Sequence, residues 1–170
     1  MSDSNDIFRE QLEILCRAGV EFIVIGGVAA LAHGAARVTY DLDIVYGRSR
    51  DNIDRLIDAL KNLEPYLRGA PPGLPFRWDA STIEHGLNFT LTTTKGPFDL
   101  LGEVAAGGTF DELVPFSTWK EVYGFRCRCV TLPKLIELKV AAGRPKDFEA
   151  IAELEALMEE IERGGYAPEA

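Results

Sequence analysis

Long apolar runs are missing from this chain of 170 residues. No stretch approaches the roughly 20 consecutive apolar residues that a membrane-spanning helix needs. The first residues, MSDSNDIFRE, are polar and acidic where a signal peptide would be apolar. From these two absences we expect a cytoplasmic protein with no membrane partner.

Cysteine and histidine are scarce as well. The chain has three cysteines, Cys16, Cys127 and Cys129, and two histidines. An odd number of cysteines in a cytosolic chain argues against a disulfide framework. Cys127 and Cys129 would share one face of a strand, but two thiols without a nearby histidine make a poor zinc site. We therefore interpret the cysteines as small apolar residues.

Positive charge is in short supply and is not clustered along the sequence. The 18 Lys and Arg residues are outnumbered by 27 Asp and Glu residues, which gives a net charge of −9. Proteins that hold a nucleic acid duplex along its backbone usually present a basic face. Extended duplex DNA is therefore not an expected partner, whereas a small substrate, a protein or an RNA end stays open.

The remaining composition is that of an ordinary globular protein, with 46% hydrophobic and 26% charged residues. This length predicts a single domain over residues 1–170. Periodicity predicts helices over residues 4–18, 28–33, 49–63 and 132–143, and a last helix from after Pro145 to about residue 162. It predicts strands over residues 21–25, 41–46, 87–95, 98–101 and 126–132. Residues 102–120 contain two adjacent glycines and a proline and predict a crossing loop with one or two helical turns.

These elements predict an α/β (α+β) fold. We expect a small mixed sheet of four to five strands, with helices packed on one face. The C-terminal helices over residues 132–162 would pack on this core.

The most informative stretch covers residues 22–46 and reads FIVIGGVAALAHGAARVTYDLDIVY. Asp41 and Asp43 stand at the start of a strand-like run, so their side chains point to the same face. Two like charges this close repel each other unless a cation lies between them. A hard divalent ion such as Mg²⁺, which prefers oxygen ligands and substrate phosphates, suits this pair.

Two glycines precede the aspartates. Gly26 and Gly27 end the first apolar run and lead into a short helical segment, where backbone N–H groups can approach an anion closely. Each motif alone has a plainer interpretation, a solvated strand edge for Asp-x-Asp and a tight turn for Gly-Gly. Their combination in a strand–helix–strand context favours a nucleotide site. The glycines do not match the G-x-G-x-x-G pattern of a dinucleotide-binding unit.

This stretch resembles the signature of the polymerase-β-like nucleotidyltransferase superfamily, in which an apolar strand, Gly-Gly or Gly-Ser and a short helix precede Asp-x-Asp. One segment is similar to small prokaryotic nucleotidyltransferases related to AbiEii-type toxins. It runs from His33 and Gly34 through Arg37 and Thr39 to the two aspartates. The specific resemblance covers residues 20–50 and continues weakly to residue 150. Many members have Ser where this chain has Gly27, so here a phosphate contact would fall to the backbone.

A third carboxylate stands on the predicted return strand of a hairpin. Phe98 and Leu100 face one way and Asp99 the other, and an acid within an apolar strand is costly unless it has a partner. Members of the superfamily carry a third carboxylate on a neighbouring strand, and Asp99 matches that placement. The resemblance implies a general base acting on the attacking hydroxyl. A polar residue on a solvated sheet face is the alternative, and Glu103 is a less favoured substitute for Asp99.

Near the C-terminus a lysine falls on an apolar helical stripe. Lys139 lies on the stripe of Leu132, Leu135 and Ile136, so it must meet an anion. Asp147 lies on the inward stripe of the last helix, so the two face each other or the site. In the similar toxin-like enzymes a lysine on a late helix contacts phosphate, whereas a structural salt bridge is the alternative here.

The resemblance implies a metal-dependent nucleotidyltransferase that uses Mg²⁺ or Mn²⁺ and moves an NMP from an NTP to a hydroxyl of RNA, protein or a small molecule. It assigns catalysis and metal binding to Asp41, Asp43 and Asp99, and cofactor binding to Gly26, Gly27, Arg37, Thr39, Lys139 and Asp147. The resemblance also implies a toxin with an antitoxin partner. Separately, the late helices are too short to build an acceptor domain alone, so a homodimer or a partner would complete the acceptor cleft. The alternatives are an inactive nucleotidyltransferase-like binding or regulatory module and an antibiotic adenylyltransferase.

Overall fold

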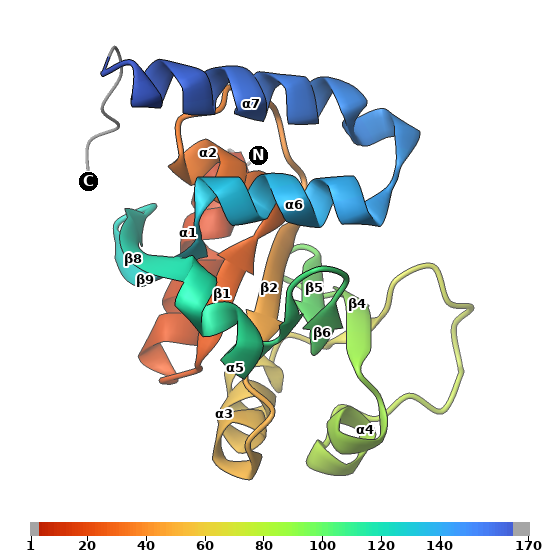
Figure 1. Cartoon of the computed structure of the whole chain (residues 1–170). Helices are drawn as coiled ribbons and strands as arrows, with labels where there is room; N and C mark the ends of the chain where they lie inside the picture. Colours follow the sequence, from red (N-terminus) through yellow and green to blue (C-terminus); the bar gives the residue numbers. More distant parts are fainter. Residues whose placement is uncertain (1–3, 165–170) are drawn as a thin grey trace.

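Seven α-helices and a large mixed sheet make up the part of the chain that the structure, a computed structural model, describes, residues 4–164 (Figure 1). The helices are α1 (Ser4–Arg17), α2 (Gly26–Ala32), α3 (Arg50–Leu60), α4 (Ala80–His85), α5 (Phe110–Leu113), α6 (Leu132–Ala142) and α7 (Phe148–Glu162). Two 3₁₀ turns, η1 (Val114–Phe116) and η2 (Pro145–Asp147), precede β8 and α7.

The main sheet has seven strands in the order β3-β4-β5-β2-β1-β9-β8. They are β1 (Phe22–Ile25), β2 (Leu42–Tyr46), β3 (Tyr66–Leu67), β4 (Asn88–Thr92), β5 (Phe98–Leu101), β8 (Ser117–Val122) and β9 (Phe125–Val130). β2 runs parallel to β5 and β1 parallel to β9, whereas the other neighbours are antiparallel. A separate two-stranded ribbon joins β6 (Glu103–Val104) to β7 (Gly108–Thr109).

The mixed α/β class predicted from the sequence is confirmed, but the sheet is larger than the four to five strands expected. The additional members are β3 and β8, which form its two edges. β3 has only two residues, and β8 lies partly in the segment predicted as a crossing loop. Edge strands bury little side chain, so neither shows the apolar alternation of a central strand.

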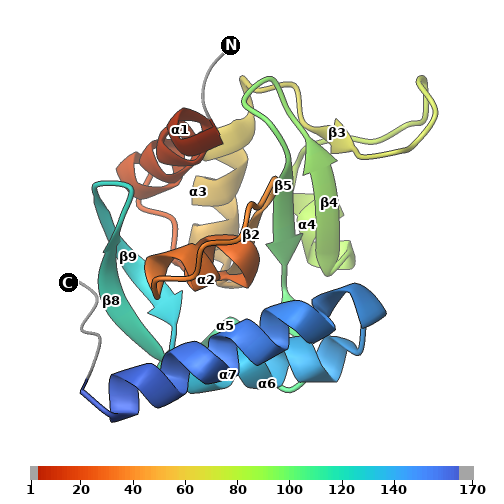
Figure 2. The same cartoon turned by 90° about the horizontal axis from the view of Figure 1, so that it is seen from above.

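Helices cover both faces of the sheet, whereas the sequence suggested one. In Figure 2, α1 and α3 lie on one side of the strands and α6 and α7 on the other. All four residues of β1 are buried, as expected for a central strand covered on both faces. On β2 the buried residues Leu42 and Ile44 alternate with Asp43, so one face joins the core and the other carries the carboxylate.

A buried amide fixes α3 to the ends of the two central strands. The Asn52 side chain accepts a hydrogen bond from the backbone N–H of Glu21 at 2.7 Å and donates to the carbonyl oxygens of Glu21 and Gly47 at 3.0 and 2.7 Å. Ser49 caps the same helix by accepting from the Asn52 N–H at 3.2 Å. These bonds hold the start of β1 against the end of β2 and help set the register that pairs Ile25 with Asp43.

The C-terminal helices form a hairpin above the carboxylate-bearing face. α6 begins at Leu132, with Pro133 in its first turn, and ends at Gly143, whose φ of +64° is the left-handed conformation favoured by glycine. η2 then turns the chain into α7, which packs on α6. No helix within residues 4–164 is both long and apolar enough to cross a membrane.

Candidate active site

A cavity of about 290 Å³ lies where α2, the start of β2, and the connection from α6 to α7 meet. All the residues that the sequence singled out line this cavity: Gly26, Gly27, Arg37, Thr39, Asp41, Asp43, Asp99, Lys139 and Asp147. They come from five separate segments of the chain, so the fold brings together residues that lie far apart in the sequence. Their catalytic and binding roles stay predictions.

The glycine pair forms the first two residues of α2, rather than a turn ahead of it. Gly26 has a φ of +65°, and a Cβ there would overlap Oδ2 of Asp43. A Cβ on Gly27 would overlap Oγ1 and Cβ of Thr39. Only glycine lets the start of the helix lie this close to the aspartate strand and to Thr39. The pair is therefore required by packing at the floor of the cavity.

Asp43 and Asp99 are directly paired across the parallel strands β2 and β5. Burial raises the pKa of Asp43 to about 8, and a side-chain hydrogen bond with Asp99, the charge of Asp99 and the charge of Asp41 act in the same direction. Oδ1 of Asp43 is buried and has no hydrogen-bond partner among residues 4–164. The two carboxyl groups thus face each other, and one oxygen of the pair is left unsatisfied.

Arg68 completes the carboxylate cluster, and no sequence pattern assigned it to the site. Its Nη2 lies 2.6 Å from Oδ1 of Asp99, and its Nη1 lies 3.9 Å from Oδ2 of Asp41. Nη2 also donates to the carbonyl oxygen of Leu91 at 2.8 Å. Arg68 opens a Pro- and Gly-rich loop and has no motif of its own, so only its place after β3, at the sheet edge, reveals the contact.

The three carboxylates supply hard oxygen donors of the kind that Mg²⁺ and Mn²⁺ prefer. The orphaned Oδ1 of Asp43 is an observation that fits a cation, because a buried carboxylate oxygen is costly without a partner. Within residues 4–164, however, no three Asp, Glu, His or Cys side chains converge as a ready-made metal site. The guanidinium of Arg68 instead contacts two of these acids, Asp99 at 2.6 Å and Asp41 at 3.9 Å.

Cationic side chains line the opposite wall. Lys139 is only 13% exposed, and its Nζ lies 3.9 Å from Oδ1 of Asp147. The helical stripes predicted that Lys139 and Asp147 face each other or the site, and they do both. Arg144, to which no sequence pattern gave a role, contacts Oδ2 of Asp147 at 2.7 Å. Two cations therefore share one buried carboxylate, which leaves this wall with a surplus of positive charge.

Arg37 and Thr39 lie at the mouth of the cavity. Arg37 contacts Glu153 at 2.9 Å and Glu149 at 3.1 Å, so it ties the aspartate loop to α7. These contacts reduce the positive charge that Arg37 was expected to offer a phosphate. The Thr39 hydroxyl donates to the carbonyl oxygen of Asp41 at 3.4 Å and so helps to shape the turn before β2.

A second cavity, of about 380 Å³, adjoins the first on the side of β4 and α6. The two cavities share Gly26, Asp43, Asp99, Lys139 and Arg144. Beyond these, the second is lined by neutral polar and apolar side chains and one exposed acid, among them Asn88, Thr90, Leu135, Leu138 and Glu103. Asp43 and Asp99 thus border both cavities, and the lining that belongs to the second cavity alone adds no Lys or Arg among residues 4–164.

The histidines and cysteines lie outside this site. His33 is buried at the end of α2 with its Nε2 2.7 Å from the carbonyl oxygen of Val130, and burial lowers its pKa, so it is a neutral structural group. Burial raises the pKa of Cys127 and of Cys129 to about 12, so neither thiol is a ready nucleophile.

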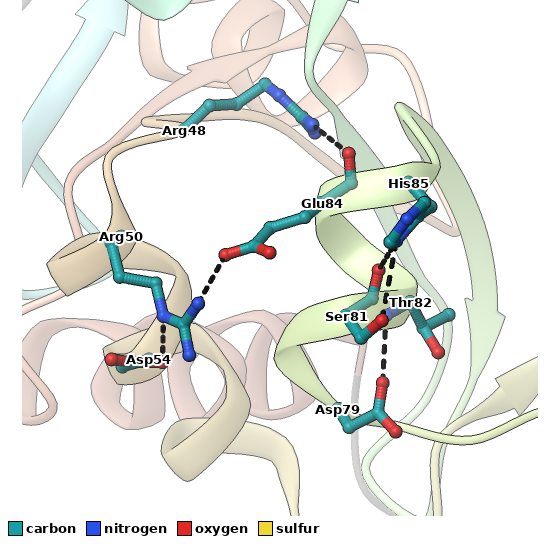
Figure 3. Close-up of polar contacts among 8 residues, drawn as sticks. All are labelled: Arg48, Arg50, Asp54, Asp79, Ser81, Thr82, Glu84 and His85. Atoms are coloured by element: carbon teal, nitrogen blue, oxygen red, sulfur yellow. Dashed lines mark hydrogen bonds and ion pairs between the residues drawn. The ribbon is translucent and has the colours of Figure 1, made fainter.

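The other histidine belongs to a polar cluster between α3 and α4 (Figure 3). Ser81, His85 and Asp79 have the composition of a nucleophilic triad, but the geometry is that of helix capping. His85 Nδ1 lies 2.7 Å from the carbonyl oxygen of Ser81, and Asp79 accepts from the backbone N–H of Thr82 at 2.8 Å. Glu84 reaches across to Arg50 at 2.8 Å, which ties the two helices together.

Comparison with known proteins gives a likeness in structure and none in sequence families. Neither the known protein families nor the curated protein sequences yield a match to this chain. Among solved structures, the chain is similar to TM1012 of Thermotoga maritima, described as a presumed nucleotidyltransferase. The TM-score is 0.56 at 12% sequence identity, over 86% of this chain and 89% of the other. At this identity the likeness shows that the chain shares the fold of a nucleotidyltransferase-like structure.

Proposed function

We propose that this chain is a divalent-metal-dependent nucleotidyltransferase, which moves an NMP from an NTP to an acceptor hydroxyl. One observation carries the proposal. Asp43 and Asp99 face each other on parallel strands beside Asp41 and the glycine start of α2, and an oxygen of Asp43 is left without a partner among residues 4–164. Such a carboxylate set beside a cation-lined cavity suits a metal-bound triphosphate. The fold shared with a nucleotidyltransferase-like structure supports this assignment.

The nucleotide would occupy the cavity of about 290 Å³. Lys139, Arg144 and Lys146 line its wall and would balance the charge of the phosphates. Gly26 and Gly27 allow the phosphates to approach the backbone at the start of α2. Tyr40 also lines the cavity and is 76% exposed, so its ring is free to stack on the nucleobase.

Asp41, Asp43 and Asp99 would hold the metal. When bound, Mg²⁺ or Mn²⁺ would supply charge neutralisation for the triphosphate and the attacking oxygen. Asp99 borders both cavities and would orient the acceptor hydroxyl and accept its proton. The hydroxyl oxygen forms a bond to the α-phosphorus, the bond from that phosphorus to the bridging oxygen breaks, and pyrophosphate leaves.

The acceptor would enter through the second cavity. Outside the residues that it shares with the first, its lining includes no Lys or Arg among residues 4–164 and one acid, Glu103. Apart from Lys139 and Arg144, which it shares with the first cavity, the second cavity adds no cation that would hold an extended RNA backbone, and this favours a neutral hydroxyl compound or a protein side chain as acceptor. A toxin that modifies a protein is thus compatible with the site, and an RNA end is the less favoured acceptor.

Labelled NTPs test the proposal. The full chain is incubated with each α-labelled NTP, Mg²⁺ or Mn²⁺, and an extract that contains RNA, protein and small molecules. Label is expected in one of these pools, and Asp41→Asn and Asp43→Asn are expected to abolish it. Glu155→Gln, on the exposed side of α7, is the matched control. Transfer that persists in both aspartate variants would overturn the assigned role of the carboxylates.

A second candidate is a nucleotidyltransferase-like binding module without catalysis. The ion pair of Arg68 with Asp99 favours it, because a cation already satisfies part of the carboxylate cluster. For this candidate the same assay gives no labelled pool, while a fluorescent NTP analogue still binds with an affinity that falls in Lys139→Ala.

A further inference from the structure

We propose that Arg68 and a divalent cation are alternative occupants of one carboxylate cluster, so that Arg68 is a positioning residue which the metal must displace. The carboxylate cluster consists of Asp41, Asp43 and Asp99, and the inference rests on the proposed function for the identity of the metal site.

The contacts of Arg68 place its charge between two of the three acids. Nη2 lies 2.6 Å from Asp99, and Nη1 lies 3.9 Å from Asp41 beside the neighbouring strand β2. An ion bound between both acids through Oδ1 of Asp99 and Oδ2 of Asp41 would take the oxygens that now face the guanidinium. Two cations do not share so small a space without strong repulsion, so occupation by one excludes the other.

Arg68 satisfies the carboxylate cluster only in part. Oδ1 of Asp43 and Nε of Arg68 are both buried and both without a hydrogen-bond partner among residues 4–164. A permanent structural ion pair normally satisfies its buried donors and acceptors, because each orphan destabilises the fold. A divalent ion would engage the orphaned oxygen of Asp43, and the departing guanidinium would reach water. The exchange would therefore give both unsatisfied atoms a partner.

The backbone of Arg68 allows its side chain to leave without moving the sheet. Its N–H donates to the carbonyl oxygen of Thr90 at 2.9 Å, which holds the backbone at the edge of β4. Its side chain is 31% exposed, and Gly69 follows with a φ of +78°. The next segment, up to residue 79, has neither helix nor strand. A rotation about the side-chain bonds of Arg68, which would also break its hydrogen bond to the carbonyl oxygen of Leu91, would thus open the carboxylate cluster.

In the metal-free chain Arg68 offsets the repulsion among the acids and keeps Asp99 in place. After displacement, the charge of Arg68 would move from the carboxylate cluster toward solvent. Arg68 is therefore expected to weaken metal binding while preserving the arrangement of the carboxylates.

Mn²⁺ affinity tests the exchange directly. Free Mn²⁺ is followed by electron paramagnetic resonance during titration into the wild-type chain, Arg68→Gln and Arg77→Gln. Arg77 is exposed in the same segment, so its replacement removes the same charge without touching the carboxylate cluster. Arg68→Gln is expected to bind Mn²⁺ on the order of tenfold more tightly than wild type, and Arg77→Gln within about twofold of it. Equal or weaker binding by a folded Arg68→Gln overturns the proposal.

A measurement on the wild-type chain covers the case in which Arg68→Gln fails to fold. Arginine side-chain N–H signals are recorded by NMR with ¹⁵N label, and the Arg68 Nε signal is assigned from Arg68→Lys. Saturating Mg²⁺ is expected to shift this signal toward the position of a solvent-exposed arginine. An unchanged Arg68 signal, with Mg²⁺ bound elsewhere or not at all, contradicts the exchange.

The two proposals fail separately. If Arg68→Gln binds Mn²⁺ more tightly but no variant transfers a nucleotide, the exchange stands and the proposed catalysis does not. If transfer occurs and depends on Asp43 while Arg68 has no effect on Mn²⁺ affinity, the catalysis stands and the exchange does not.

Discussion

Replacement of Asp43 by asparagine should stabilise the metal-free chain, and the gain should increase with pH. The pKa of Asp43 is raised from 3.8 to about 8, first by burial and then by the hydrogen bond and charge of Asp99. Between these values the folded chain keeps a proton that the unfolded chain has released. The folded state then binds more protons, so the free energy of unfolding falls as the pH rises through this window.

The structure bounds the size of the effect. A difference of about four pKa units corresponds to at most ~6 kcal/mol once the pH exceeds the folded-state value. Because Asp43 interacts strongly with the neighbouring Asp99 carboxyl group, we expect about half of this, ~3 kcal/mol, at pH 8.5 and a negligible difference at pH 4. The side-chain amide of the Asp43→Asn variant would have no proton to lose and could donate an N–H to Asp99, so the stability of this variant should lack the decline.

Urea denaturation in EDTA, followed by circular dichroism between pH 4 and 8.5, measures the difference. Glu155→Gln is the control for the loss of one negative charge, because Glu155 is exposed on α7. Stability curves of wild type and Asp43→Asn that stay parallel across this range would refute the reasoning, since they would show that Asp43 is ionised in the folded chain at ordinary pH.

Three further changes test other parts of the structure. Lys139→Ala should weaken binding of a fluorescent NTP analogue about tenfold; an unchanged affinity, with stability lost, would mean that Lys139 only pairs with Asp147. Gly27→Ala should lower the free energy of unfolding by about 1–3 kcal/mol, because its methyl group overlaps Thr39, and a neutral result in denaturation would contradict that packing. His33, whose pKa burial lowers, should make wild type lose stability as the pH falls below ~6.5, because the unfolded chain binds the proton first; His33→Gln should lack this loss.

Much of the site was predictable from local sequence. Asp41 and Asp43 share a face because they are two residues apart on a strand. The Gly-Pro turn predicted the strand of Asp99, and the resemblance to the superfamily assigned Asp99 to the site. Lys139 could be assigned an inward position from its place on a helical stripe, and its nearest acid is the one expected. In each case the signal lies within one or two neighbouring elements.

Contacts between distant segments were not predictable in the same way. Arg68 lies 31 residues before Asp99, in a loop whose composition indicates only a turn. The edge strand β8 carries Trp119 and Lys120 with little burial, so its pairing with β9 leaves no apolar pattern in the sequence. Arg144 looked like part of a connection, and only the turn of η2 brings it to Asp147. These contacts depend on how distant segments of the chain come together in the fold, which local sequence does not indicate.

Anomalous scattering from crystals of the chain grown with Mn²⁺ and a non-hydrolysable NTP tests the proposed site most directly. We expect a manganese peak about 2.1 Å from oxygens of Asp43 and Asp99, with the triphosphate in the cavity lined by Lys139 and Arg144. A manganese peak or a triphosphate located elsewhere, with Arg68 still bound to Asp99, would contradict a metal-dependent nucleotidyltransferase site at these carboxylates.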